Sequence, residues 1–128
     1  MSDSTTDSSD SESLRVLVVS DNQAVRDEFA YGFPTGVEVS FARDSRDAWR
    51  LLREQAPSAV VVELQTGSAG GYNLAKEMSA TDLAEIPVVI LLDREQDAWL
   101  ARQAGARNYH LKPVSASEVL EDFRAPTS

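Results

Sequence analysis

The chain has 128 residues, 42% of them hydrophobic, and no cysteine. It therefore predicts one ordinary domain with a real core, and it excludes disulfides, a thiolate metal site and a thiol nucleophile. The formal net charge of −9 disfavours direct binding to DNA or RNA, because an acidic body repels phosphate backbones. No apolar run approaches the length of a membrane span, and the N-terminus lacks the features of a secretory signal, so we expect a cytoplasmic protein.

The first segment, MSDSTTDSSDSES, consists of serine, threonine and acids with almost nothing to bury. Its acids are Asp3, Asp7, Asp10 and Glu12, and it holds no base. This composition predicts a disordered acidic tail over residues 1–13. One folded domain is expected over residues 14–124, followed by a short C-terminal tail over residues 125–128.

Strand and helix patterns alternate from residue 14 onward. The apolar run LRVLVV predicts a buried strand at 14–19, and a helical pattern follows at 23–31. The alternating VEVSF predicts an edge strand at 37–41, and a second helix is expected at 45–55. AVVV at 59–62 is another buried run, and the Gly-rich GSAGG leads into a third helix.

The second half continues the same alternation. IPVVILL predicts a third buried strand at 86–92, and the helical pattern at 94–104 stops at Gly105, a typical C-terminal glycine. ARNYHL predicts a short strand, and Ser115 with Glu118 forms a capping box that opens the last helix.

This order of elements predicts a three-layer α/β/α fold with five parallel strands and helices on both faces. In such a fold the site lies where the central strands end. The side chains expected at that edge are Ser20, Asp21, Glu63, Leu92, Asp93, Lys112 and Pro113. Acidic side chains and one lysine would thus converge there.

Over residues 14–123 the chain resembles the receiver domains of two-component response regulators. The resemblance rests on VLVVSDN, PSAVVVEL, the GG before the third helix, IPVVILL, AGARNYHLKP and the final helix. It implies a flavodoxin-like, CheY-like sheet in strand order 2-1-3-4-5 with five helices. The SDN and DREQDAWLARQAGA segments are further similar to orphan actinobacterial receivers, which carry no output domain. Because the sequence stops after the fifth helix, we expect a stand-alone bacterial receiver without a DNA-binding module.

In this family, two acids after the first strand and an aspartate after the third hold Mg²⁺, and that aspartate accepts a phosphoryl group from a histidine kinase. A threonine or serine after the fourth strand binds a phosphate oxygen, and a lysine neutralises the developing charge. Its bond to the following proline is usually cis. Positioning and electrostatic stabilisation perform this chemistry.

Matched residue by residue, three of these five chemical positions are altered. The acid pair is Ser20 and Asp21, so one carboxylate remains, and the acceptor aspartate is Glu63. The hydroxyl position is Leu92, which cannot hydrogen-bond a phosphate. The retained positions are Lys112, Pro113 and the aromatic switch residue Tyr109.

The carboxylate of Glu63 sits one methylene further out than that of an aspartate, and a displacement of ~1 Å can cost about 10²-fold in rate. Lys112 is its expected partner in a charge-assisted hydrogen bond. Two interpretations stay open. Glu63 either imitates the phosphorylated state, with about −1 charge against nearly −2, or forms a structural ion pair left from a lost site.

Other roles at this edge are limited. Asp21 is expected to contribute to weak Mg²⁺ binding at most, with Glu63 and the carbonyl of Gln65, or simply to cap the first helix. No cofactor is required. Ser20 has no histidine base near it in the motif, and His110 is expected to be a strand residue without a catalytic role, so we expect no enzyme.

In the family, the fourth helix, fifth strand and fifth helix contact partners or a second receiver. Tyr109, Trp99 and Ala98 are the candidates for this surface, which implies a protein partner or a homodimer. A tryptophan on an amphipathic helix is more often part of the core edge, and we place Trp99 there, with partner contact as the alternative. Trp49 is expected to be structural.

Three functions remain open. The first is an atypical receiver, or pseudo-receiver, that binds protein partners in signalling without conventional phosphorylation. The second is a phosphoryl-accepting regulator in a phosphorelay that uses Asp93 or Asp21. The third is an accessory or structural subunit of a larger assembly, including a respiratory membrane complex. The kinase, the partner and the oligomeric state cannot be read from the sequence.

Overall fold

The computed structural model describes residues 14–64 and 70–124. The two predicted tails and Gln65 lie outside these ranges. The described elements are β1 (Leu14–Val19), α2 (Gln23–Gly32), β2 (Val37–Ala42), α3 (Ser45–Glu54), β3 (Ala59–Glu63), α4 (Gly71–Ser79), β4 (Val88–Leu92), the 3₁₀ helix η1 (Glu95–Asp97), α5 (Ala98–Gln103), β5 (Asn108–Leu111) and α6 (Ala116–Arg124). No helix in the described ranges is long and apolar enough to cross a membrane.

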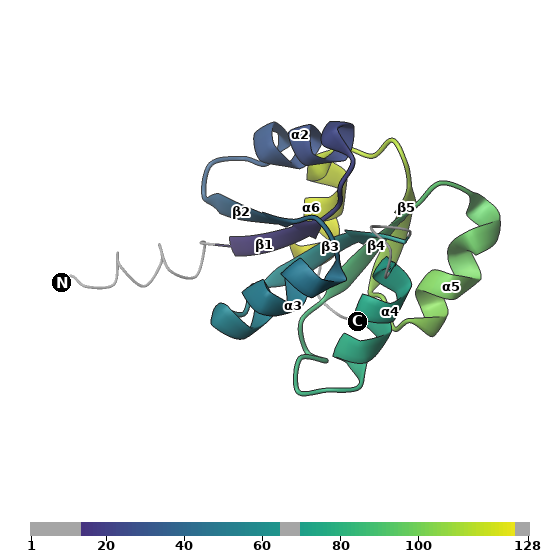
Figure 1. Cartoon of the computed structure of the whole chain (residues 1–128). Coiled ribbons are helices and arrows are strands. Elements are labelled where there is room, and N and C mark those ends of the chain that lie inside the picture. The colour runs from purple at the N-terminus through teal and green to yellow at the C-terminus, as the bar shows by residue number, and fades with distance from the viewer. Residues whose placement is uncertain (1–13, 65–69, 125–128) are drawn as a thin grey trace.

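The strands form one parallel sheet in the order β2-β1-β3-β4-β5. Helices α2 and α6 cover one face, and α3, α4 and α5 cover the other (Figure 1). The predicted three-layer fold, with five α-helices in the described ranges, is confirmed. The alternating strand β2 lies at one edge, as its pattern indicated.

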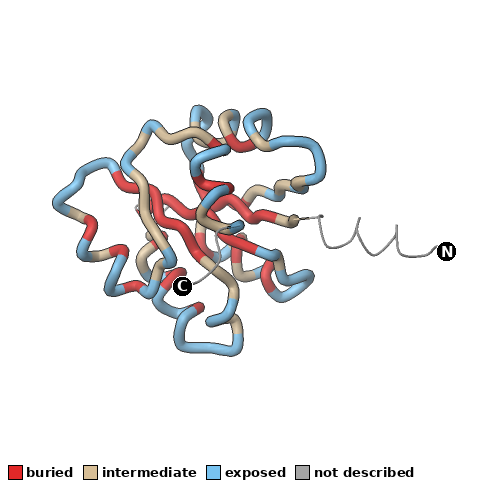
Figure 2. The backbone as a smooth tube through the Cα atoms, turned by 180° about the vertical axis from the view of Figure 1, so that it is seen from behind, coloured by how far each residue is buried: buried red, intermediate tan, exposed pale blue. Residues whose placement is uncertain are grey.

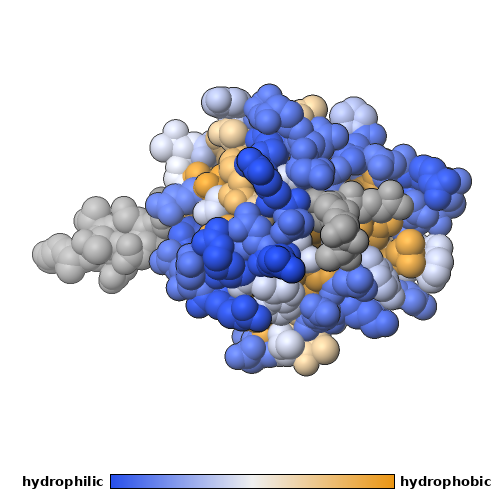
Figure 3. Space-filling model, viewed as in Figure 1, coloured by the Kyte–Doolittle hydropathy of each residue, from blue (hydrophilic) through white to orange (hydrophobic). Residues whose placement is uncertain are grey.

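The core consists of two layers, one on each face of the sheet. Side chains of a strand point alternately to opposite faces, so Val60 and Val62 join the layer of α3, α4 and α5, whereas Ala59 and Val61 join that of α2 and α6. Figure 2 shows the resulting stretches of buried backbone in the central strands. The face seen in Figure 3 is mainly hydrophilic, with only scattered apolar surface.

Several predicted boundaries differ from the observed ones, and two of the differences illustrate what the pattern missed. The strand predicted from residue 86 begins at Val88, because Ile86 still belongs to a turn in which its N–H donates to the carbonyl of Leu83. The helix predicted at 94–104 begins as the 3₁₀ turn η1 and becomes α-helical only at Ala98. Its expected end is confirmed, because Gly105 has a φ of 85° and closes α5.

The N-terminus of α2 is capped by Asn22 and not by Asp21. The side-chain oxygen of Asn22 accepts from the N–H groups of Ala24 at 2.9 Å and Val25 at 3.3 Å, which satisfies two of the donors that a helix leaves unpaired at its start. Asp21 is exposed. An aspartate and an asparagine in succession both suit a cap, and only the backbone geometry decides between them.

Replacing Asn22 with alanine should lower the free energy of unfolding by about 1 kcal/mol, because the cap is lost and nothing replaces it. Urea denaturation followed by circular dichroism would measure this. Asp21→Ala is the matched control and should stay within about 0.5 kcal/mol of the wild type. A larger loss for Asp21→Ala than for Asn22→Ala would contradict the assignment of the cap.

Candidate functional site

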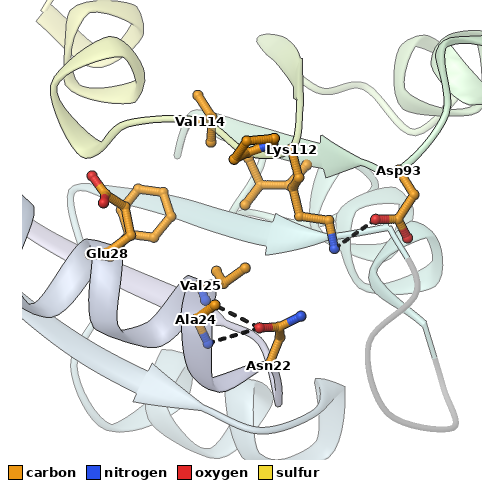
Figure 4. Close-up of a pocket in the computed structure, with 10 residues that line it drawn as sticks. Asn22, Ala24, Val25, Glu28, Asp93, Lys112 and Val114 are labelled. Atoms are coloured by element: carbon orange, nitrogen blue, oxygen red, sulfur yellow. Dashed lines mark hydrogen bonds and ion pairs between the residues drawn. The ribbon is translucent and has the colours of Figure 1, made fainter.

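Ser20, Glu63 and Lys112 meet at the carboxyl edge of the sheet. The Oγ of Ser20 donates to one carboxylate oxygen of Glu63, and the Nζ of Lys112 donates to the other. Nζ also contacts the Oδ1 of Asp93 at 3.0 Å (Figure 4). Ser20 is fully buried and Glu63 is 4% exposed. The structure thus brings together the expected ion pair and Ser20, which sequence analysis placed at this edge without predicting its hydrogen bond to Glu63.

The ends of neighbouring strands place these side chains. Ser20 continues β1, and its N–H donates to the carbonyl of Ala42 at 2.9 Å. Glu63 is the last residue of β3. Lys112 follows β5, and its N–H donates to the carbonyl of Leu92 at 2.9 Å. The bond from Lys112 to Pro113 is cis, as the family resemblance implied.

The ammonium group of Lys112 contacts two carboxylates, those of Glu63 and Asp93. Burial lowers the pKa of Lys112, but its hydrogen bonds to Glu63 and Asp93, together with their negative charges, raise it, and the net result lies above the ordinary value of 10.5. Lys112 is therefore charged at neutral pH and neutralises the buried carboxylate of Glu63. Every buried side-chain nitrogen or oxygen in the described ranges has a hydrogen-bond partner, so the cluster is internally satisfied.

The residues present do not fit a Mg²⁺ ion. Both oxygens of Glu63 are engaged by Ser20 and Lys112. Asp21 is exposed and lines a hollow with Gln23, Arg26 and Arg43, and Glu63 is not part of that lining. Within residues 14–64 and 70–124, no group of three histidines, cysteines or acids is placed to hold a metal ion. The predicted carbonyl ligand of residue 65 lies outside the described residues.

Sequence analysis matched Leu92 and Tyr109 to the hydroxyl and the aromatic switch of the resembled family. Leu92 is fully buried in the layer of α3, α4 and α5, and Tyr109 packs against the same layer. The hydroxyl of Tyr109 donates to Glu95 at 3.4 Å. The space for a phosphate-binding hydroxyl is thus filled by a core side chain.

The expected partner surface is only partly as predicted. Trp99 is 51% exposed, so its placement at the core edge was wrong. Ala98 is buried and cannot contribute to an exposed surface. Leu111 on β5 is an additional exposed apolar side chain. Trp49 is structural, because it packs on the core and its Nε1 donates to Glu77 at 3.2 Å.

His110 has partners that sequence analysis missed. Its Nε2 lies 2.6 Å from Oδ2 of Asp122, and the side-chain amide of Asn108 donates to the other oxygen of Asp122 at 2.7 Å. This cluster joins β5 to α6. No short-range signal could have found it, since the partners lie on different elements.

Residues 16–124 match the family described as the response regulator receiver domain, and the chain belongs to this family. Such domains are components of two-component signalling. Response regulator MprA of Mycolicibacterium vanbaalenii is 30% identical over 115 residues, covering 88% of this chain and 49% of that protein. The virulence transcriptional regulatory protein PhoP of Salmonella typhimurium is 32% identical over 115 residues, covering 88% and 51%.

The chain spans about half the length of these curated relatives. A putative response regulator from Chloroflexus aurantiacus has a similar fold, with a TM-score of 0.81 and 21% identity, covering 88% of this chain and 98% of that one. The chemotaxis response regulator CheY4 of Vibrio cholerae gives a TM-score of 0.76 at 19% identity, covering 84% and 93%.

Proposed function

We propose that this receiver is an atypical signalling module that binds a protein partner without phosphorylation of an aspartate and without enzymatic activity of its own. One observation carries the proposal. The residue at the acceptor position, Glu63, is buried and holds Ser20 and Lys112 with its two oxygens. A nucleophile in this arrangement has no free oxygen aimed at an incoming phosphoryl group.

The neighbouring positions support the same conclusion. Leu92 replaces the hydroxyl that would bind a phosphate oxygen, and it is closely packed in the core. Asp93, the alternative acceptor, is 67% exposed and bound to Lys112. A water-excluded, preorganised site is what phosphoryl transfer needs, and an exposed carboxylate does not provide one.

Partner binding is the function that the remaining surface favours. Trp99 on α5 and Leu111 on β5 are both exposed, and exposed tryptophan is enriched among the residues that contribute most to protein interfaces. Both side chains belong to elements that the resemblance assigns to partner contact. No cofactor is part of this proposal.

The test is incubation with Mg²⁺ and an excess of acetyl phosphate or beryllofluoride. We expect no gain of phosphate in the intact mass and no saturable shift of the amides of Glu63, Leu92 and Tyr109 in NMR spectra. The physical reason is that Lys112 is already neutralised and no oxygen of Glu63 is free.

The matched control is the triple variant Ser20→Asp, Glu63→Asp, Leu92→Thr, which restores the residue types of the family. If this variant folds, its amides should show a saturable shift with beryllofluoride. Such a shift would demonstrate that the reagents are active. A saturable shift or a phosphate adduct on the wild-type chain would overturn the proposal and restore the switch.

A further inference from the structure

A second hollow lies beside the charged cluster. It occupies about 360 Å³ between α2 and the connection from β5 to α6 (Figure 4). This volume lies at the lower end of the range of small-molecule sites, roughly 300–1,000 Å³. Its position at the carboxyl edge of a parallel sheet is where α/β folds bind ligands. We call it the α2 groove.

The walls of the α2 groove are largely apolar. Phe29 and Leu91 are almost completely buried and form part of its lining. Val25 and Val114 are half-buried and belong to opposite sides, α2 and the connection after β5 (Figure 4). A ligand in the groove would therefore need an apolar body to gain from burial.

The charges around the groove are predominantly negative. Glu28 and Asp93 lie at opposite ends of the lining (Figure 4). The only lining base, Lys112, is already neutralised by Glu63, which lies outside the lining. The groove and its immediate surroundings thus hold three carboxylates, two of them in the lining, and one ammonium group, so the local field disfavours an anion and favours a cation.

Glu28 is the better binding group of the two lining acids. It is half-buried, and its Oε2 accepts from the N–H of Ala116 at 2.8 Å, which fixes the carboxylate in place. Its Oε1 makes no hydrogen bond to any described residue. Asp93 is exposed and already bound to the Nζ of Lys112, which would repel a second cation there.

We propose that the α2 groove binds a small organic cation, an aliphatic ammonium ion, with its head group on Glu28 and its chain against Val25 and Val114. Asp93 adds negative field at the other end. This site goes beyond the proposed function and does not depend on it, because no phosphoryl chemistry is involved. Ligand binding in the α2 groove would act on the receiver without involving the acceptor position, Glu63.

The experiment is an NMR titration of the full chain with hexylammonium chloride, followed at the amides of Ala24, Val25 and Val114. Hexanol and sodium hexanoate are the neutral and anionic probes with the same chain length. We expect saturable shifts with hexylammonium, binding of hexanol weaker by about tenfold, and no saturation with hexanoate, because the charge-assisted hydrogen bond to Glu28 supplies the difference.

Two variants locate the site. Glu28→Gln keeps an oxygen for the N–H of Ala116 but removes the charge, and it should weaken hexylammonium binding by about tenfold. Ala24→Leu fills the groove without altering a charge and should weaken hexylammonium and hexanol alike. Asp82→Asn removes an exposed carboxylate far along the chain and should leave binding unchanged. Thermal melts establish that each variant is folded.

Equal binding of hexylammonium and hexanol, an absence of saturation, or unchanged binding in the folded Ala24→Leu variant would each overturn the proposal. Shifts of the same amides that depend on protein concentration without any amine would overturn it too, because a second copy of the chain would then occupy the groove. If Glu28→Gln fails to fold, the comparison of the three probes and Ala24→Leu decides the matter.

Discussion

Replacement of Lys112 with methionine should destabilise the protein by about 3 to 5 kcal/mol, the cost of leaving one partner of a buried ion pair without the other. Glu63 is 4% exposed and would keep only the hydroxyl of Ser20 as a partner. Methionine has nearly the length of lysine, so the loss reports charge and not packing. Urea denaturation monitored by circular dichroism gives the free energy of unfolding.

Replacing the other partner of the ion pair, Glu63, should destabilise the protein less. Glu63→Gln leaves Lys112 bound to Asp93, and the lysine is 17% exposed, so water and Asp93 share its charge. We expect a loss of about 1 to 2 kcal/mol. The double variant should be more stable than the sum of the single losses predicts, by about 2 kcal/mol, since both charges are then absent.

The effect has a defined pH dependence. The pKa of Lys112 is raised in the folded state by Glu63 and Asp93 against the opposing effect of burial. A base with a raised pKa contributes stability that is fully present below its ordinary value of 10.5 and is lost as the pH rises through the folded value. The difference between the wild type and Lys112→Met should therefore shrink only above pH 10.5.

The control is Lys76→Met, which removes the other lysine of the chain. Lys76 lies 5.6 Å from the ring centre of Tyr72 on α4, and such a contact contributes about 0.5–1 kcal/mol. If both methionine variants lost the same stability, the buried pair would not be the cause. The interpretation of Glu63 and Lys112 as a stabilising structural ion pair would then fail.

Gly71→Ala should be the second severe substitution, with a loss of about 3 kcal/mol, the upper end of the usual cost of overpacking. An added Cβ would clash with the backbone carbonyl of Glu63 and lie 2.6 Å from Cγ2 of Val62. No side-chain rotation relieves a contact with a backbone atom. The start of α4 would have to move away from β3.

Thermal unfolding and amide shifts of Glu63 measure this effect, because the clash acts on the strand end that holds the site. Ser79→Ala, in the same helix but exposed, is the control and should change stability by less than about 0.5 kcal/mol. If the stability of the Gly71→Ala variant equalled that of the wild type, α4 would be free to shift. The close approach of α4 to β3 would then contribute nothing to stability.

The fold was predictable because three of its strands are continuous apolar runs separated by helical patterns. The β-branched residues Val60 to Val62 favour a buried strand, and a chain of β–α units leaves one handedness for the crossovers. The contact of Glu63 with Lys112 followed from the same logic, since parallel strands end at one edge. Strand ends are therefore the part of a site that sequence reasoning recovers best.

Sequence reasoning missed which side chains of a helix face the core and which residues far apart in the chain contact each other. Trp99 and Ala98 are adjacent on α5, yet Ala98 is buried and Trp99 is exposed. Glu28 caps α6 from a position 88 residues earlier in the chain. No periodicity records such a contact, because it arises only when two helices are packed side by side.

The two layers of the core have an unequal distribution of chromophores. Trp49 and Trp99 both lie on helices of the layer formed by α3, α4 and α5, and α2 and α6 carry no tryptophan. Intrinsic tryptophan emission therefore observes one side of the sheet. A loosening of α2, or of the segment after Lys112, would be almost silent in fluorescence. If the unfolding midpoint from tryptophan fluorescence differed from that of circular dichroism, the difference would show which layer of the core opens first.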